Sequence, residues 1–261
     1  MGRTLSYKLV IVAIILLGIN MLHFYNFLIF HSIVELYCIA VAIAVFTLVW
    51  NLRDQINHTF VLVVGVGYLY TGLFDFIHIL TFEGMNVIPL TESHFDVDSW
   101  LIARYIESIS ILLAVILQKF KVNVKLDFLI SVYLVISIMI FYITFINDHI
   151  PNGYISGSGI TQFKIMNELI ICVFLGLTIL ILSMNKKLLK KNTLVYTMIA
   201  LVLTLLSEIS FMFFSNKSDW IFILGHNIKV LSYFFTYSAI STVVIMERRI
   251  DQDICKHSHW L

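Results

Sequence analysis

The feature that most constrains the fold of this chain is a series of apolar runs of about twenty residues, separated by short polar stretches. An α-helix rises about 1.5 Å per residue, so one such run crosses the roughly 30 Å hydrocarbon core of a bilayer. Only two prolines occur in the 261 residues. We therefore predict an all-α polytopic membrane bundle of about eight helices, at residues 6–24, 30–50, 59–80, 98–117, 125–145, 163–184, 193–214 and 220–246.

The composition excludes a soluble fold. Hydrophobic residues make up 60% of the chain and charged residues 13%, against roughly 45–50% and about 25% in soluble domains. The net charge of +1 gives no concentrated basic face, so nucleic acid is not expected as a partner. We expect one membrane domain over residues 1–246, followed by a cytoplasmic tail at 247–261 that is too short for an output domain.

Basic residues in short loops predict the orientation, because such loops stay on the cytoplasmic side. One set of ends and loops contains Arg3, Lys8, Arg53, Lys119, Lys121, Lys125, Lys186, Lys187, Lys190, Lys191, Arg248, Arg249 and Lys256. The opposite set contains only Lys217. Both termini are therefore predicted to be cytoplasmic, with the loops near Glu83–Asp98, Asn147–Gln162 and Ser215–Asp219 outside. The acidic side chains of the first of these loops are expected to be solvated.

Ionisable side chains inside the predicted spans are the most informative residues, because a charge in hydrocarbon costs several kcal/mol unless it is paired or hydrated. They are His31, Glu35, Asp75, His78, Arg104, Glu107, Lys164, Glu168, Glu208, His226 and Lys229. Neighbours on one helix are three or four residues apart and share a face. With the predicted orientation, all of them lie in the outer half of the bilayer. The simplest packing is one polar chamber that opens outward.

Two interpretations of this polar layer stay open from the sequence. Pairs such as Arg104 with Glu107 or Lys229 with Glu208 are expected to offset part of the desolvation cost, and polar groups also tie membrane helices together. The other interpretation is a ligand or ion site. Imidazole and carboxylate groups are ordinary metal ligands, and the candidates for a metal ion are His31, Glu35, Asp75, His78 and His226. Metal ion and haem are both open as cofactors.

Six blocks of the sequence, in order, resemble the membrane-associated sensor family of the third type. They are FHSIVELYCIAVAIAVFTLVWN, GVGYLYTGLFDFIHILTFEGMNV, WLIARYIESISILL, GSGITQFKIMNELII, LTLLSEISFMFF and LGHNIKVLSYFFTYSAI. Positions that match the family's motifs are His31, Glu35, Asp75, His78, Gly84, Met85, Arg104, Glu107, Lys164, Glu208, His226 and Lys229. The resemblance implies a sensory input domain of the bacterial cytoplasmic membrane, usually fused to a histidine kinase or a diguanylate cyclase. This chain would then signal to such a module in trans or in a longer form, alone or as a homodimer.

Rival functions belong to other classes. Histidines at similar depth favour a metal or haem protein, although no ligand motif of fixed spacing is present. Clustered acids and bases could serve an intramembrane enzyme or a transporter. Lys229 in the last helix could hold retinal, although its off-centre position disfavours this. Tyr68 and Trp100 are expected only in helix packing or interfacial belts.

Overall fold

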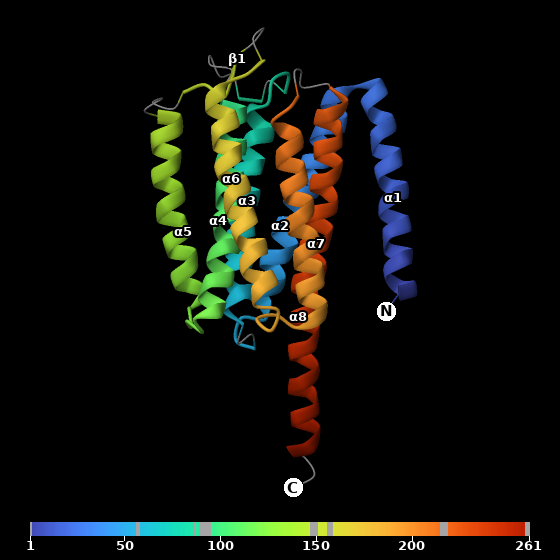
Figure 1. The fold of residues 1–261 in the computed structure, drawn as a ribbon, viewed down its shortest axis with the longest axis vertical. Helices are drawn as coiled ribbons and strands as arrows, with labels where there is room; N and C mark the ends of the chain where they lie inside the picture. The colour runs from blue at the N-terminus through green and yellow to red at the C-terminus, as the bar shows by residue number, and fades with distance from the viewer. Residues whose placement is uncertain are drawn as a thin grey trace.

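The computed structural model describes residues 2–55, 58–85, 87–88, 95–146, 151–155, 159–214 and 219–258. All eight predicted helices are present (Figure 1): α1 Gly2–Tyr25, α2 Phe27–Asn51, α3 Thr59–Thr81, α4 Phe95–Lys119, α5 Leu126–Phe141, α6 Gln162–Met184, α7 Lys191–Phe211 and α8 Trp220–Ser258. A π-helical turn, Tyr142–Ile146, extends α5, and the short strands β1 (Tyr154–Ile155) and β2 (Gly159–Ile160) pair antiparallel before α6.

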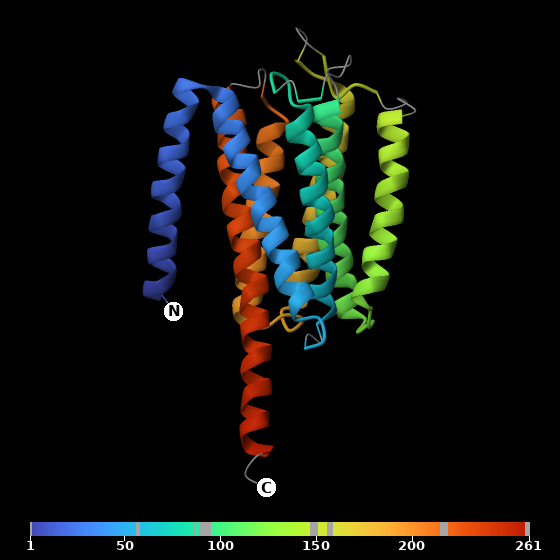
Figure 2. The same cartoon turned by 180° about the vertical axis from the view of Figure 1, so that it is seen from behind.

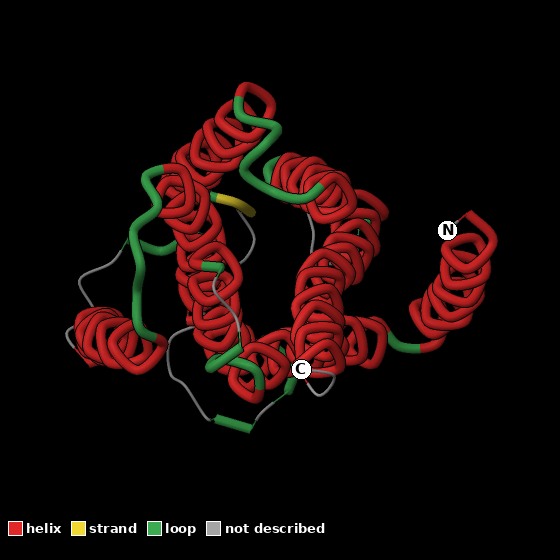
Figure 3. Tube along the Cα trace, turned by 90° about the horizontal axis from the view of Figure 1, so that it is seen from below, coloured by secondary structure: helices red, strands yellow, loops and turns green. Residues whose placement is uncertain are grey.

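The helices form a closed ring with two helices outside it. Around the ring, α2 contacts α3, α3 contacts α4, α4 contacts α6, α6 contacts α7, α7 contacts α8, and α8 returns to α2. Figure 3 shows this arrangement from below, with α1 standing apart from the ring. Outside the ring, α1 lies against α2 and α5 lies against α3. A site inside the ring is therefore built by α2, α3, α4, α6, α7 and α8.

Within the described part of the chain, six helices are long and apolar enough to cross a membrane: α2, α3, α4, α5 with its π-helical turn, α6 and α7. The most apolar window of α3 is 78% buried within the protein, whereas that of α5 is 17% buried. Because a bilayer solvates apolar side chains, an exposed apolar helix surface is expected on the lipid side. The fold is an all-α membrane helix bundle.

Local sequence explains where two of the helices begin and how closely two others approach. The Asn26 side chain accepts hydrogen bonds from the first turn of α2, at 2.8 Å from the Leu28 nitrogen, and Thr161 caps α6 in the same way. These caps satisfy amide groups that have no partner within the helix. Where α3 crosses α4, a methyl group on Gly67 would lie 2.4 Å from the Ser110 Cβ, so only glycine permits this contact.

Two predicted boundaries need correction. The last helix was predicted to end at residue 246, but α8 continues as a helix to Ser258, through most of the expected tail. Helix α4 begins at Phe95, so Asp96 and Asp98 lie in its first turn and are buried, not solvated as the sequence suggested. An aspartate in the first turn interacts favourably with the positive end of the helix dipole. Residues 86 and 89–94 of the predicted outer loop lie outside the described residues.

Figure 2, seen from behind, shows α1 beginning at the same end of the bundle at which α8 leaves it. Below the ring, α8 projects alone.

Candidate functional site

The ring gathers all eleven predicted site residues in its interior. Each is buried, with 5% or less of its surface exposed. His31 and Glu35 come from α2, Asp75 and His78 from α3, Arg104 and Glu107 from α4, Lys164 and Glu168 from α6, Glu208 from α7, and His226 and Lys229 from α8. Helix spacing explains the shared faces, because residues three or four apart project from the same side of a helix.

Asp75 is the centre of a network of charged side chains. Its two carboxylate oxygens accept hydrogen bonds from one Arg104 nitrogen at 2.9 and 2.8 Å, and one of them accepts the Tyr233 hydroxyl at 3.1 Å. The Lys229 ammonium lies 3.4 Å from the other oxygen and donates to both Glu35 oxygens at 2.9 and 2.7 Å. Asp75 thus connects α3 to α4 and α8, while Lys229 connects α8 to α2.

Arg104 also binds the Glu107 carboxylate one turn later on α4, as expected. The Tyr68 hydroxyl donates to the same carboxylate at 2.8 Å and lies 3.0 Å from the Thr236 hydroxyl. The expected pairing of Lys229 with Glu208 is wrong, because the lysine binds Glu35 and Asp75 instead. The Glu208 Oε2 atom makes no hydrogen bond within the described part of the chain.

A second ion pair lies on α6, where Lys164 binds the Glu168 carboxylate four residues later. The lysine also donates to the Phe211 carbonyl oxygen at 3.0 Å. Its ammonium lies 4.7 Å from the centre of the Trp100 ring and 5.0 Å from that of Phe214, which are cation–π contacts. Trp100 therefore has a direct role beside a buried charge, beyond the packing role expected from the sequence.

Three histidines lie together next to the charged network. His31 on α2 is central: its ring centre is 5.3 Å from that of His78 and 5.0 Å from that of His226. It stacks on Phe82, with ring centres 3.9 Å apart. The His226 Nε2 atom lies 3.3 Å from a Glu35 oxygen. The structure therefore brings four of the five metal candidates together, whereas the Asp75 carboxylate is held by Arg104, Lys229 and Tyr233.

A cavity of about 30 Å³ separates the histidines from Lys164. It lies where α4, α6 and α8 begin and α3 and α7 end. Its walls are His78, Phe82, Asp96, Val97, Trp100, Lys164, Phe211, Phe214, Phe222 and His226. A space of this size holds water or a small ion. It is much smaller than the roughly 300 Å³ or more of a pocket for a drug-sized ligand, so this conformation does not favour haem.

Sequence reasoning missed two hydroxyl groups of the network. Tyr233 follows Lys229 by four residues on α8, and Tyr68 precedes Asp75 by seven on α3, so spacing alone places each on the site face. The Tyr68 hydroxyl donates to the buried Glu107 carboxylate and the Tyr233 hydroxyl to the buried Asp75 carboxylate. Such partners are needed because a buried charge must have its hydrogen bonds satisfied.

Comparison with known proteins decides the family. The profile of the membrane-associated sensor domain, MASE3, matches residues 22–247. The chain belongs to this family. The match covers α2 to α7 and the part of α8 that lines the site, so it includes all eleven buried ionisable residues. No curated protein and no solved structure matches this chain. Membership in a sensor domain family supports a sensory role and a multi-pass membrane location.

Proposed function

We propose that this chain is the input domain of a signalling system, and that a small ligand or ion is detected in its buried polar layer. The observation that carries the proposal is the position of α8. Lys229 attaches this helix to Glu35 of α2 and Asp75 of α3, and the same helix continues out of the ring to Ser258. A change inside the layer can therefore reach the far end of α8 without an intermediate element.

The proposal includes eight membrane spans, with both termini in the cytoplasm. Thirteen basic residues against one favour this orientation. The 39 residues of α8 would measure about 58 Å at 1.5 Å per residue, well beyond a bilayer core of about 30 Å. On this topology, the projecting end of α8 is cytoplasmic and the cavity beside Lys164 faces outward.

Signalling requires two arrangements of the ring whose populations the ligand changes. A ligand shifts such an equilibrium only by its difference in affinity for the two arrangements, about tenfold for each 1.4 kcal/mol. Lys229 holds two carboxylates from two helices, so a ligand that competes for Glu35 would release α8 from α2 while α3 keeps its contact. A tilt or slide of α8 would follow.

The output partner is proposed to be a cytoplasmic histidine kinase or diguanylate cyclase, bound to this chain in trans or joined to it in a longer form, with a homodimer as one arrangement. The chain itself is proposed to have no catalytic role. Its sequence has no glycine loop that could cradle a nucleotide phosphate.

Electron spin resonance distances on the whole chain would test whether the buried layer controls α8. Spin labels at Asp54→Cys, beyond α2, and Gln252→Cys, on the projecting part of α8, report on the cytoplasmic end after the native cysteines are replaced. Glu35→Gln and Asp75→Asn should each shift the distance distribution by about 1–2 Å or more, the scale of helix shifts in known switches.

The matched control is Asp127→Asn on α5, which makes the same chemical change at an exposed carboxylate outside the ring. It should leave the distance distribution unchanged. If neither layer variant differs from the control, α8 is not coupled to the layer and the proposed transmission is wrong.

A further inference from the structure

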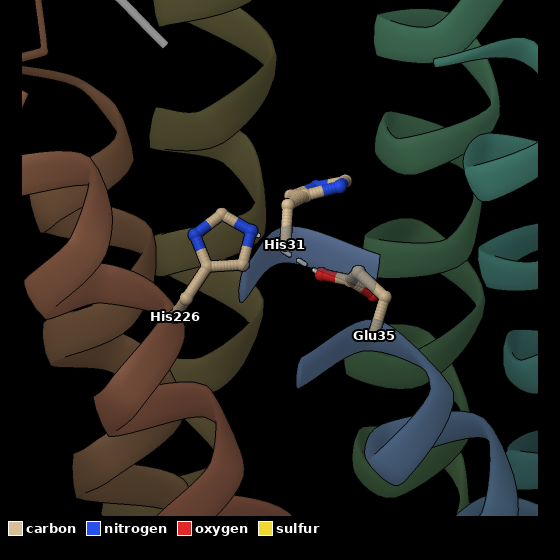
Figure 4. Close-up of side chains that lie close together, drawn as sticks. All are labelled: His31, Glu35 and His226. Atoms are coloured by element: carbon tan, nitrogen blue, oxygen red, sulfur yellow. Dashed lines mark ion pairs between the residues drawn. The ribbon is translucent and has the colours of Figure 1, made fainter. Parts of the chain in front are cut away.

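Three potential ligand atoms converge where α2 meets α8. His31, Glu35 and His226 each offer one nitrogen or oxygen atom, and these atoms all lie within 4.8 Å of one another. Figure 4 shows the His226 ring and the Glu35 carboxylate facing each other, with the His31 side chain beside them. All three residues are buried, at 1% exposure or less. Convergence alone is common among polar side chains, so the protonation of each group decides what the cluster can hold.

His226 presents a lone pair to Glu35. Its Nδ1 atom lies 2.8 Å from the Phe222 carbonyl oxygen, and because a carbonyl only accepts, this nitrogen carries the proton. In a neutral ring Nε2 is then an acceptor. It lies 3.3 Å from a Glu35 oxygen, which is also an acceptor, and it makes no hydrogen bond within the described residues. Two facing acceptors need a positive species between them.

The contacts of His78 determine which nitrogen of His31 carries the proton. His78 Nδ1 lies 2.6 Å from the Asp96 carbonyl oxygen and donates to it. His78 Nε2 is then an acceptor, and it lies 3.3 Å from His31 Nε2, which must donate. The proton of neutral His31 is therefore on Nε2, and its Nδ1 keeps a lone pair. That Nδ1 atom has no hydrogen-bond partner among the described residues.

We propose that His31, Glu35 and His226 bind a first-row transition-metal dication such as Zn²⁺. This inference rests on the proposed sensory function and names the class of ligand. In a tetrahedral site with metal–nitrogen distances of about 2.0–2.1 Å, neighbouring ligand atoms are about 3.3–3.4 Å apart, close to the 3.3 Å between His226 and Glu35. His78 is a positioning residue, since metal-bound histidines usually donate their other N–H group to a fixed acceptor.

Two imidazole nitrogens and one carboxylate oxygen select the class of metal. This donor set suits zinc, copper and iron, whereas Ca²⁺ and Mg²⁺ take oxygen ligands. The Glu35 carboxylate can serve a metal while Lys229 is bound, because each of its oxygens has two lone pairs. Lys229 lies closer to Oε2, at 2.7 Å, than to Oε1, which faces His226.

The charge of the layer also favours a bound cation. Among buried side chains of the described residues, carboxylates outnumber lysine and arginine by seven to three. Without Asp96 and Asp98, at the outer end of α4, five carboxyl groups face three cations, an excess of two negative charges when every carboxyl group is ionised. A dication would cancel these charges in a medium where unpaired charge is costly. The cavity of about 30 Å³ borders His226, one of the three proposed ligands, and extends to Lys164 at the start of α6.

Metal binding to the purified whole chain tests the proposal. After treatment with a chelator, the protein in detergent is dialysed against Zn²⁺, and bound metal is measured by mass spectrometry, with Mg²⁺ and Ca²⁺ as comparison ions. We expect one Zn²⁺ per chain and neither comparison ion. His31→Gln, His226→Gln and Glu35→Gln should weaken Zn²⁺ binding by at least a hundredfold, and His78→Gln by about 10–100-fold. Asp127→Asn, at an exposed carboxylate of α5, and His58→Gln, at the residue before α3, should bind like the wild type.

The wild type alone provides a second measurement, which matters if a variant does not fold. X-ray absorption of the Zn²⁺ complex should show nitrogen and oxygen neighbours, including two imidazole rings. The metal site would be refuted if the wild type bound less than a tenth of an equivalent of Zn²⁺, or if the three ligand variants bound Zn²⁺ as fully as the wild type. A proton shared by His226 and Glu35 would then be the positive species between them. The spin-label distances need no added metal, so a shift of α8 with no Zn²⁺ binding would refute this inference while supporting the sensory proposal.

Discussion

Removing the Lys229 charge should be among the most destabilising single changes in the ring. The substitution Lys229→Met keeps an unbranched side chain of similar length but removes the ammonium that binds Glu35 at 2.7 and 2.9 Å. Asp75 would keep Arg104 and Tyr233, whereas Glu35, which is fully buried, would keep only the contact with His226. The cost therefore falls mainly on Glu35.

Leaving one member of a buried ion pair without its partner costs about 3–5 kcal/mol. The double variant Lys229→Met, Glu35→Gln removes both charges, and the new amide can donate to the His226 lone pair. We expect it to be more stable than the single variant by about 2 kcal/mol, within the usual range of coupling between contacting residues. If the double variant is more stable than Lys229→Met alone, the stability lost in the single variant comes from the unpaired Glu35 carboxylate and not from lost packing.

Reversible unfolding in mixed detergent micelles, with a chelator present, would measure these free energies. Lys187→Met, at an exposed position between α6 and α7, is the control for loss of a lysine and should change stability by less than about 0.5 kcal/mol. A cost below about 1 kcal/mol for Lys229→Met would refute the reasoning. So would a double variant as unstable as the single one.

Four further outcomes are expected. Tyr233→Phe should cost about 1–3 kcal/mol by leaving Asp75 and Arg104 short of a hydrogen bond, while Tyr237→Phe, on the exposed side of α8, should cost almost nothing in the same unfolding assay. Gly67→Ala should destabilise by about 1–3 kcal/mol, because Ser110 occupies the space of the new methyl; a neutral result would contradict the close helix contact. A cysteine at Asn152 should react with an impermeant reagent from outside, and one at Asp54 only after permeabilisation; the reverse pattern would invert the proposed orientation. The purified chain should not turn over nucleotides, and measurable kinase or cyclase activity would contradict the assignment as an input domain.

The sequence predicts the helices well because apolar runs report burial in lipid directly. It predicts their ends less well, since a helix can continue where no apolar signal is required. The projecting part of α8 is an example, because charged residues such as Glu247 and Arg248 form good helices in water but mark the end of a span. Similarly, Asp96 looks like a loop residue until the first turn of α4 is seen to bury it.

The sequence also identifies which residues form the site, but not which of them meet. Buried ionisable residues stand out because their cost in hydrocarbon demands a reason. Their partners depend on how the ring closes: Glu35 and Lys229 are 194 positions apart, and only the contact between α2 and α8 joins them. Spacing along α4 predicts the pair of Arg104 and Glu107. Nothing in the sequence around Glu208 indicates that Lys229 binds Glu35 and Asp75 instead.

The helix that contributes most to the proposed mechanism also carries several polar side chains in its first turns. Three polar side chains, His226, Asn227 and Lys229, lie within four residues of one another on α8. Two of these groups have polar partners: Lys229 binds two carboxylates inside the ring, and Asn227 exchanges amide hydrogen bonds of 2.9 Å with Asn20 of α1, outside the ring. The stability of α8 in the membrane thus depends on its polar partners. A helix held in this way responds when those partners change, which is the property that the proposed transmission requires.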